Sequence, residues 1–225
     1  MELVFASWSG GKDCCLSLYR ALVSGLEVRY LANTVTEDGK RSRSHGVSAE
    51  VIQAQSQAIG IPLAQRPTTR ENYEAEFIKM LRAFKQEGIE GGVFGDIDFN
   101  EHRQWIDRVC HEADITPHLP LWLESQDKLV REFIDLGFEA IVVAAKAELF
   151  GEEVLGQKID RDFISHLEEL GKTKKITPCG ESGEYHTLVV DGPIFKKRLE
   201  ILETRKELRE GTRFLDILTV AIKDK

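Results

Sequence analysis

The sequence predicts an α/β protein with a doubly wound parallel sheet, followed by a smaller C-terminal α+β subdomain. Short apolar runs alternate with helical patterns up to about residue 146, and the remaining chain is more polar and mixed. Strand–helix alternation of this kind is typical of a parallel sheet with helices on both faces. A chain of 225 residues accommodates one large or two small domains, and we expect a boundary that divides it into 1–122 and 123–225.

The first elements are read from apolar runs and turn residues. Leu3–Ser7 is a buried run, followed by a glycine turn and a helical pattern. The first expected strands are 2–7, 26–34 and 62–66, and the first expected helices are 13–24 and 48–59. A further helix is expected after Thr68 and Glu71, which stand at capping-box spacing. Its apolar face ends at Gly88 and contains Tyr73, Phe77, Met80, Leu81 and Phe84.

The later elements follow the same rhythm. The strand 91–95 precedes a helix over 100–112, and a helix over 125–136 stops at Gly137. The continuous apolar run 141–145 predicts another buried strand. The run places no polar side chain on either face, so the strand should be covered on both sides.

Composition excludes several classes of protein. The chain is 42% apolar and its net charge is 30 − 38 = −8, so it is neither disordered nor a general binder of nucleic-acid backbone. The longest uncharged run, 51–65, contains glutamines and a serine, and no membrane span is expected. The N-terminus lacks a basic leader segment, which favours a cytoplasmic location. Lys172, Lys174 and Lys175 form a local basic patch.

The cysteines and histidines do not indicate a metal centre. Cys14, Cys15, Cys110 and Cys179 form no CxxC pair, and the six histidines show no HxxxH or HExxH spacing. We expect reduced, mostly buried thiols and no structural zinc.

The most informative segment is Ser7–Asp13, which reads SWSGGKD between the first strand and the first helix. Gly10 and Gly11 allow a sharp turn whose N–H groups, with the helix N-terminus, suit a phosphate group. Ser9 adds a hydroxyl, Lys12 a positive charge, and Asp13 a carboxylate that can hold Mg²⁺. The alternative is an ordinary glycine turn with a surface lysine. The segment is neither a Walker A loop nor a GxGxxG motif.

SGGKD after a first strand resembles the PP-loop of the N-type ATP pyrophosphatases, which have an adenine-nucleotide alpha-hydrolase-like fold of the HUP type. These enzymes cleave ATP between the α and β phosphates. The resemblance implies that Ser7, Ser9, Gly10, Gly11, Lys12 and Asp13 bind ATP, with Mg²⁺ on Asp13. It also places Ala32, Asn33 and Thr34 near the adenine, with the loop Ser44–Gly46, and hence His45, beside it. His45 could equally be a surface loop residue.

Two later groups of residues suggest where the chemistry takes place. Asp96 ends a predicted strand and could bind Mg²⁺ or orient a nucleophile, and Arg103 could neutralise the α-phosphate. The alternative is a capping aspartate and a solvated arginine. Trp105, Ile106 and Val109 have the spacing of core residues, and we assign them no chemistry.

The second group lies in the glycine-rich turn 179–188. Glu181 and Glu184 suit a metal or an amine, and His186 could accept a proton. The alternative is an acidic turn before a strand.

Together, SGGKD, the GDI…HR…LPLW pattern and CGESGEYHTLVVDGPIF resemble the diphthine–ammonia ligase family and its bacterial relatives over residues 3–195. The resemblance implies that ATP adenylates a carboxylate and ammonia then converts it to an amide, releasing AMP and pyrophosphate. It implies catalytic roles for Lys12, Asp96, Arg103, Glu181, Glu184 and His186. The acceptor would be diphthine on elongation factor 2 if the source makes diphthamide.

The sequence departs from the family's usual pattern at Asp96 and His186, as bacterial members do, which leaves open a different small-molecule or protein carboxylate. No glutaminase signature is present, so free ammonia would be the donor, and a homodimer is compatible with the sequence. Two other hypotheses remain: a PP-loop enzyme acting on tRNA, and a non-catalytic module that binds ATP or AMP.

Overall fold

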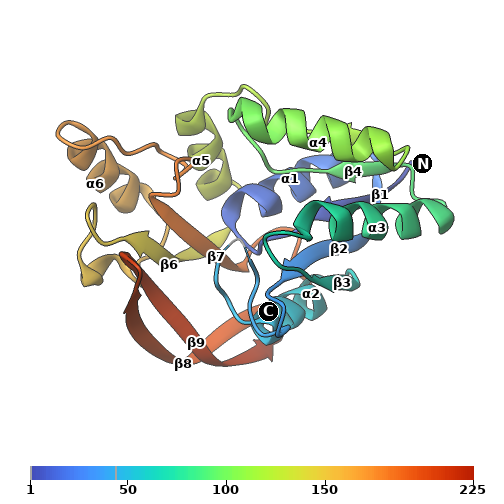
Figure 1. The fold of residues 1–225 in the computed structure, drawn as a ribbon. Helices are drawn as coiled ribbons and strands as arrows, with labels where there is room; N and C mark the ends of the chain where they lie inside the picture. Colours follow the sequence, from blue (N-terminus) through green and yellow to red (C-terminus); the bar gives the residue numbers. More distant parts are fainter. Residues whose placement is uncertain (1, 44) are drawn as a thin grey trace.

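The computed structural model describes residues 2–43 and 45–225, and it contains two sheets (Figure 1). The first is parallel, with strand order β3-β2-β1-β4-β5. Its strands are β1 (Leu3–Ser7), β2 (Glu27–Val35), β3 (Leu63–Pro67), β4 (Gly91–Val93) and β5 (Thr116–His118). Its helices are α1 (Lys12–Val23), α2 (Ala49–Ile59), α3 (Tyr73–Gln86) and α4 (Asn100–Glu112). The predicted fold class is confirmed.

The second sheet is antiparallel, with strand order β7-β6-β9-β8. Its strands are β6 (Glu139–Lys146), β7 (Tyr185–Asp191), β8 (Arg198–Arg209) and β9 (Thr212–Lys223). Helix α5 (Gln126–Asp135) precedes it in the chain, and a 3₁₀ turn (Glu152–Val154) and α6 (Arg161–Gly171) lie between β6 and β7. The apolar run 141–145 is therefore a strand, as predicted, but it belongs to this second sheet.

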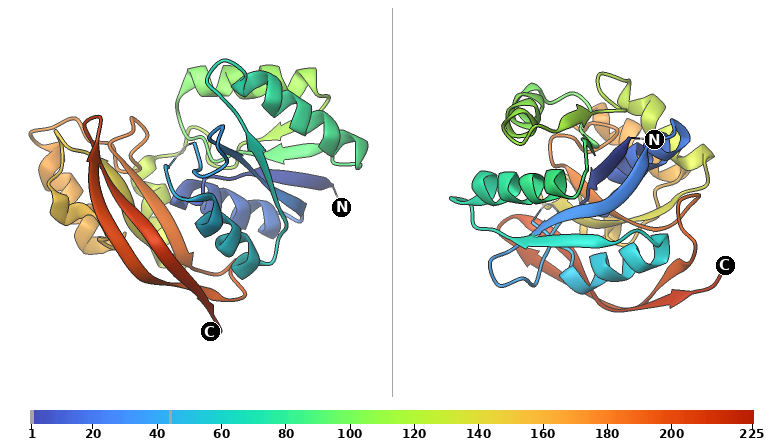
Figure 2. Two further views of the ribbon diagram at one scale, coloured as in Figure 1. Left: turned by 60° about the horizontal axis from the view of Figure 1, so that its bottom comes forward. Right: turned by 90° about the vertical axis from the view of Figure 1, so that its right-hand side faces the viewer.

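Side chains of β1 alternate between two helical layers. Phe5 packs on Phe84 of α3, with ring centroids 5.3 Å apart, and shares a core with Ile106 of α4. Val4 and Ala6 face the opposite way, into the core formed with α1 and α2. Alternation of this kind follows from the two-residue period of a strand, and Figure 2 shows the helices on both faces of the parallel sheet.

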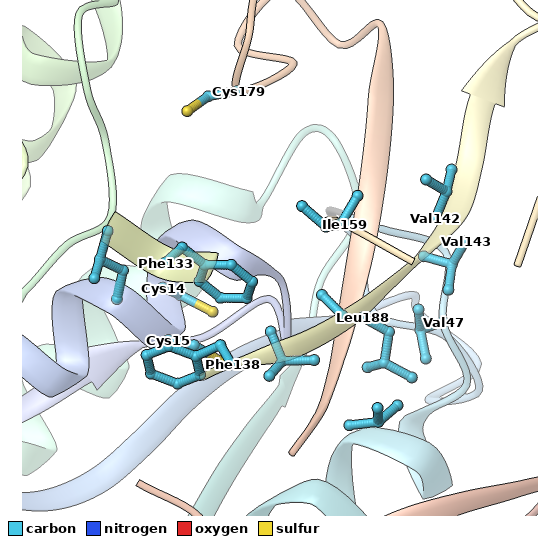
Figure 3. Close-up of a cluster of buried hydrophobic side chains, with 14 of the residues drawn as sticks. Cys14, Cys15, Val47, Phe133, Phe138, Val142, Val143, Ile159, Cys179 and Leu188 are labelled. Carbon is cyan, nitrogen blue, oxygen red and sulfur yellow. The ribbon is translucent and has the colours of Figure 1, made fainter. Parts of the chain in front are cut away.

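The second sheet packs on the α1/α2 side of the parallel sheet. Figure 3 shows Leu188 of β7 and Val142 and Val143 of β6 in one cluster with Cys14 and Cys15 of α1. Backbone bonds join the layers as well, since the amide of Val189 donates to the Gly10 carbonyl at 2.9 Å. The two parts of the chain thus share one hydrophobic core.

The sequence prediction was wrong about the start of α3. The helix begins at Tyr73, with Asn72 rather than Thr68 at the N-cap. Thr68 lies too far before the helix to cap it, and its hydroxyl donates to the Val35 carbonyl at 3.2 Å. Thr69 and Asn72 bond each other's backbone amides instead, at 2.7 and 3.2 Å.

Three strands were not predicted. β5 has only three residues and contains a proline, which gives no periodic signal. The β8–β9 hairpin has a clear length of 12 residues in each strand, but its pairing shifts register between Ile201 and Thr204. A bulge of this kind breaks the two-residue alternation on which strand prediction relies. Among the described residues, no helix is long and apolar enough to cross a membrane.

Candidate active site

A cavity of about 610 Å³ lies where β1, β2 and β4 end, with the segment before β7 on its other side. Ligands of doubly wound sheets bind at this edge. Its lining residues come from both parts of the chain: Ser7, Trp8, Ser9, Lys12, Asp13, Cys14, Ala32, Thr34, His45, Tyr73, Phe77, Phe94, Gly95, Asp96, His102, Trp105, Ile106, Cys179, Gly180, Glu181, Gly183, Tyr185, His186 and Thr187.

The glycine loop before α1 is pressed between α2 and β7. Gly10 has a φ of 83°, and a Cβ there would lie 2.7 Å from Cδ1 of Ile52. Gln55 holds the loop from the same side, because its amide donates to the Gly10 carbonyl at 3.0 Å. A Cβ on Gly11 would overlap the ring of His45. Only glycine fits at either position, and contacts with Ile52, Gln55 and His45 hold the loop in this conformation.

Lys12 is the buried cation of the site. Only 3% of the residue is exposed, so it is not the surface lysine of the alternative interpretation. Its ammonium group donates to the Cys179 carbonyl and pairs with Asp13 Oδ2 at 2.8 Å. Burial alone would lower the pKa of Lys12, but Asp13 and other nearby groups outweigh it and the pKa is raised. The lysine is therefore charged at every physiological pH.

Three carboxylates, Asp13, Asp96 and Glu181, line the same cavity. Burial, together with the negative charge of Asp13, raises the pKa of Glu181 to about 7, although Lys12 opposes the rise and Asp96 adds to it. His102, from the first turns of α4, bonds Asp96 at 3.1 Å, and this bond raises the pKa of His102. Within residues 2–43 and 45–225, no three His, Cys, Asp or Glu side chains converge closely enough to hold a metal by themselves.

His45 and His186 stack beside the loop, with ring centroids 4.7 Å apart. The Nδ1 of His45 lies 2.9 Å from the Thr187 carbonyl, which can only accept, so this nitrogen carries the proton. Burial lowers the pKa of His45 to about 4, with Lys12 contributing. Burial, His45 and Lys12 lower the pKa of His186 to about 3. Both imidazoles are neutral at pH 7 and offer lone pairs to the cavity.

Aromatic side chains form the far end of the cavity. The Trp105 ring lies 5.6 Å from that of Tyr73 and 5.1 Å from that of Phe77, measured between centroids. Trp105 is oriented by its indole N–H, which donates to Glu74 Oε2 at 2.9 Å. The prediction that Trp105 and Ile106 are core residues is confirmed, since Ile106 belongs to a buried cluster on which Trp105 packs. Both also line the cavity, which helical spacing alone does not show.

The predicted site residues separate into two sets. The structure brings Ser7, Ser9, Lys12, Asp13, Thr34, His45, Asp96, Glu181 and His186 to the cavity. It does not bring Asn33 there, because the Asn33 amide is buried against the Trp8 carbonyl and Ser42 Oγ, at 2.8 and 3.0 Å. Ser44, of the predicted adenine-side loop, lies outside the described residues.

Arg103 and Glu184 also lie elsewhere. The Arg103 guanidinium pairs with Asp107 one helical turn away, at 2.8 Å, and lies 5.6 Å from the Trp122 ring centroid. The Glu184 carboxylate accepts the Thr177 amide at 2.7 Å and lines a different cavity. His102 and Thr187 also line the cavity. Both stand within the quoted patterns, His102 in GDI…HR…LPLW and Thr187 in CGESGEYHTLVVDGPIF, but neither was assigned a role from the sequence.

The chain matches two family models in succession. Residues 2–117 match the diphthamide synthase N-terminal domain, and residues 125–221 match the diphthamide synthase C-terminal domain. The chain belongs to the diphthamide synthase family. The resemblance to diphthine–ammonia ligases predicted from the sequence is thereby confirmed.

Relatives of the family are similar over most of this chain. The diphthine–ammonia ligases of Rattus norvegicus and Homo sapiens are each 29% identical to it, over 88% and 87% of this chain and 82% and 81% of their own lengths. The diphthine–ammonia ligase of Schizosaccharomyces pombe is 30% identical over 90% of this chain, which spans 36% of that longer protein. A crystal structure of a predicted subunit of tRNA methyltransferase from Methanocaldococcus jannaschii aligns with a TM-score of 0.48 and 15% identity. The alignment covers 86% of this chain and 98% of that chain, and the similarity is too low to bear on function.

Proposed function

We propose that this protein is an ATP-dependent ligase that adenylates a carboxylate and converts it to an amide with ammonia, releasing AMP and pyrophosphate. Family membership supports the reaction class. The observation that carries the proposal is that Lys12 and Glu181 line the same cavity. A permanently charged lysine at a helix N-terminus suits a leaving pyrophosphate, and a carboxylate with a pKa of about 7 suits a proton acceptor.

The triphosphate is expected on the loop before α1. The triphosphate would face Ser7, Ser9 and the N-terminus of α1. Gly10 and Gly11 shape the loop, and Lys12 supplies the positive charge. The base is expected at the aromatic end, between Thr34 and Trp105, where a flat ring can stack. Asn33 supports this end indirectly by fixing the Trp8 carbonyl, and His45 closes the side of the loop.

Mg²⁺ fits the charge of the site. Asp13, Asp96 and Glu181 place three carboxylates in one cavity, and Asp13 and Asp96 add to the rise that burial causes in the pKa of Glu181. Since no described cluster holds a metal alone, the ion would share Asp13 and Asp96 with phosphate oxygens, as Mg²⁺ commonly does. When bound, it would neutralise phosphate charge.

The chain's own residues then have distinct roles. The acceptor carboxylate attacks the α-phosphorus, the bond to the β-phosphate oxygen breaks, and Lys12 stabilises the departing pyrophosphate. Ammonia next attacks the acyl carbon, the bond to AMP breaks, and the nitrogen gives up a proton. Glu181 is positioned to accept this proton. The pKa of His186, about 3, makes its neutral imidazole a weak base that suits a hydrogen bond to the substrate better than proton transfer, so its role as a proton acceptor stays a prediction. Asp96 orients His102 at the cavity wall.

We propose that residues 1–122 bind ATP and that residues 123–225 receive the acceptor. Glu181 and His186 come from the second part and face the nucleotide loop of the first. The acceptor is either diphthine on elongation factor 2 or another carboxylate. The predicted cytoplasmic location, homodimer, and roles of Arg103 and Glu184 in catalysis stay predictions.

Acceptor-dependent pyrophosphate release tests the proposal. The purified protein is supplied with ATP, Mg²⁺, ammonium and either diphthine-bearing elongation factor 2 or a panel of small carboxylates. Lys12→Ala should abolish release, and Lys79→Ala, which removes a lysine whose side chain is 59% exposed on α3, should leave it unchanged. Full release by Lys12→Ala would refute the loop assignment. Tight ATP binding without release for any acceptor would favour the non-catalytic module, and release dependent on tRNA would favour a tRNA enzyme.

A further inference from the structure

A second cavity, of about 800 Å³, lies on the other side of the loop Thr177–Glu184 from the nucleotide cavity. The two linings have no residue in common. Gly180, Glu181 and Gly183 of this loop face the nucleotide cavity. The second cavity is lined by Lys146, Glu148, Leu149, Lys174, Lys175, Ile176, Thr177, Ser182 and Glu184.

Three lysines give this cavity a positive rim. The Lys146 ammonium donates to the Ser182 carbonyl at 2.9 Å, and the Lys174 ammonium donates to the Leu149 carbonyl at 2.6 Å. These bonds hold two charges at the rim, and Lys175 is exposed beside them. Glu148 is the one acid on the exposed rim of this lining. A local concentration of lysines in a chain of net charge −8 favours an anionic ligand.

The floor of the cavity carries a buried carboxylate with spare hydrogen-bonding capacity. Glu184 is only 1% exposed, and its Oε1 accepts the Thr177 amide at 2.7 Å. Its Oε2 is buried and has no hydrogen-bond partner among the described residues. Because an unpaired buried carboxylate oxygen is costly, this cavity favours a ligand that brings a hydrogen-bond donor as well as negative charge.

We propose that the second cavity binds an acidic peptide segment of a protein partner. Aspartate or glutamate side chains of the segment pair with Lys146, Lys174 and Lys175, and a backbone N–H of the segment donates to Glu184 Oε2. A volume of about 800 Å³ holds a short segment of chain. A nucleic-acid phosphodiester offers only acceptor oxygens and would place one of them against Glu184, so the floor disfavours it.

This docking site stands whether or not the protein is a ligase. If it is, the segment would rest on the same loop that presents Glu181 to the nucleotide cavity, Thr177–Glu184. A partner seated there would therefore contact the element that carries the proposed proton acceptor.

Amide chemical shifts of the full-length, isotope-labelled chain provide the test. The probes are capped ten-residue peptides in which four glutamates, four glutamines or four lysines alternate with alanine and serine, together with a ten-nucleotide oligothymidine and inorganic phosphate. We expect the glutamate peptide to shift the amides of residues 174–177 and 182–184, and the glutamine and lysine peptides to leave them unchanged. Raising the salt should weaken the binding.

Variants test separately the lysines at the rim of the cavity and the Glu184 carboxylate at its floor. The double variant Lys174→Gln and Lys175→Gln should bind the glutamate peptide about tenfold more weakly, while Lys196→Gln with Lys197→Gln, a lysine pair outside the cavity lining, should bind normally. Glu184→Gln replaces the acceptor at the floor by a donor, so it should weaken peptide binding and strengthen phosphate binding. Equal binding of the glutamine peptide, tighter binding of the oligonucleotide or phosphate, or no shifts at these amides would overturn the inference.

Discussion

The backbone amide of Lys12 donates a hydrogen bond to the hydroxyl of Thr187 at 3.0 Å, across 175 positions of the chain. Lys12 is the first residue of α1, and Thr187 is the third residue of β7. One N–H at the start of α1 is thus already bound by the C-terminal sheet. The Thr187 carbonyl also accepts the bond from His45, so a single residue holds both the loop and the histidine that covers it.

Replacing this hydroxyl should weaken nucleotide binding. Thr187→Val keeps the shape of the side chain but leaves the buried Lys12 amide without its acceptor, at a cost of about 1–3 kcal/mol. We expect lower thermal stability and an ATP dissociation constant raised about tenfold, both measured by calorimetry. Thr187→Ser retains the hydroxyl and should bind nearly as the parent does. Equal loss in both variants would show that the methyl group matters instead.

The ionised carboxylate of Glu181 should lower the free energy of unfolding at alkaline pH. Its pKa in the folded protein is about 7, raised from 4.5 by burial and by Asp13, so folding disfavours the ionised form. The unfolded chain ionises this carboxylate above pH 4.5 and the folded protein only above pH 7, so stability falls as the pH rises through that window.

Glu181→Gln removes this cost. We expect the variant to be more stable than the parent by about 2 kcal/mol at pH 8 and equal to it below pH 4.5, measured by urea unfolding. The same variant should lose amide formation, because Glu181 is the proposed proton acceptor of that step. A variant that is less stable at pH 8 would show that the Glu181 carboxylate makes favourable contacts that outweigh its burial.

Trp105 provides a test of the aromatic end of the cavity. Trp105→Ala removes the ring that lies between Tyr73 and Phe77, and we expect ATP affinity to fall about tenfold, as stacking contributes about 1–1.5 kcal/mol. Trp122→Ala, at a tryptophan outside the cavity lining, is the matched control. Equilibrium binding of a fluorescent ATP analogue measures both, and an unchanged affinity in Trp105→Ala would place the base elsewhere.

The sequence could predict that residues of the loop before α1 line one cavity, because these residues are neighbours in the chain. Ser9, Lys12 and Asp13 are within five positions of each other, and their spacing after a strand already determines where they point. Glu181 and His186 were found for the same reason, since they flank a glycine-rich turn. At these positions, residues that are close in the sequence are also close in space.

Other assignments depended on tertiary partners that spacing does not reveal. Arg103 has the same helical position whether it faces a phosphate or Asp107, and the structure has it paired with Asp107. Glu184 resembles Glu181 in the sequence, yet its carboxylate closes the turn on Thr177. Trp105 belongs to the apolar face of an amphipathic helix, and its spacing does not show that its ring, packed against Tyr73 and Phe77, also lines the cavity.

The ion pair between Arg41 and Asp216 should hold the His45 loop in place. Arg41 binds both carboxylate oxygens of Asp216, at 2.8 and 3.1 Å, and donates to the Gly46 carbonyl at 2.8 Å. Asp216 is only 5% exposed and also accepts from Arg209 at 2.6 Å. Removing the carboxylate leaves Arg41 without its carboxylate partner and leaves Arg209 with Glu207 alone, at 3.3 Å, which costs about 2–3 kcal/mol when part of the network remains hydrated.

We therefore expect Asp216→Ala to lower the free energy of unfolding by about 2–3 kcal/mol and to weaken ATP binding as well, because His45 lies against Gly11. Asp216→Asn should retain part of the stability through its amide oxygen. Asp224→Ala removes an aspartate that is 86% exposed and paired with Lys197, and it should change neither quantity measurably. Urea unfolding and ATP calorimetry give both values. Loss of stability with unchanged ATP affinity would mean that the loop keeps its position without the ion pair. The hydrogen bond between His45 and the Thr187 carbonyl would then be sufficient to hold His45 in position.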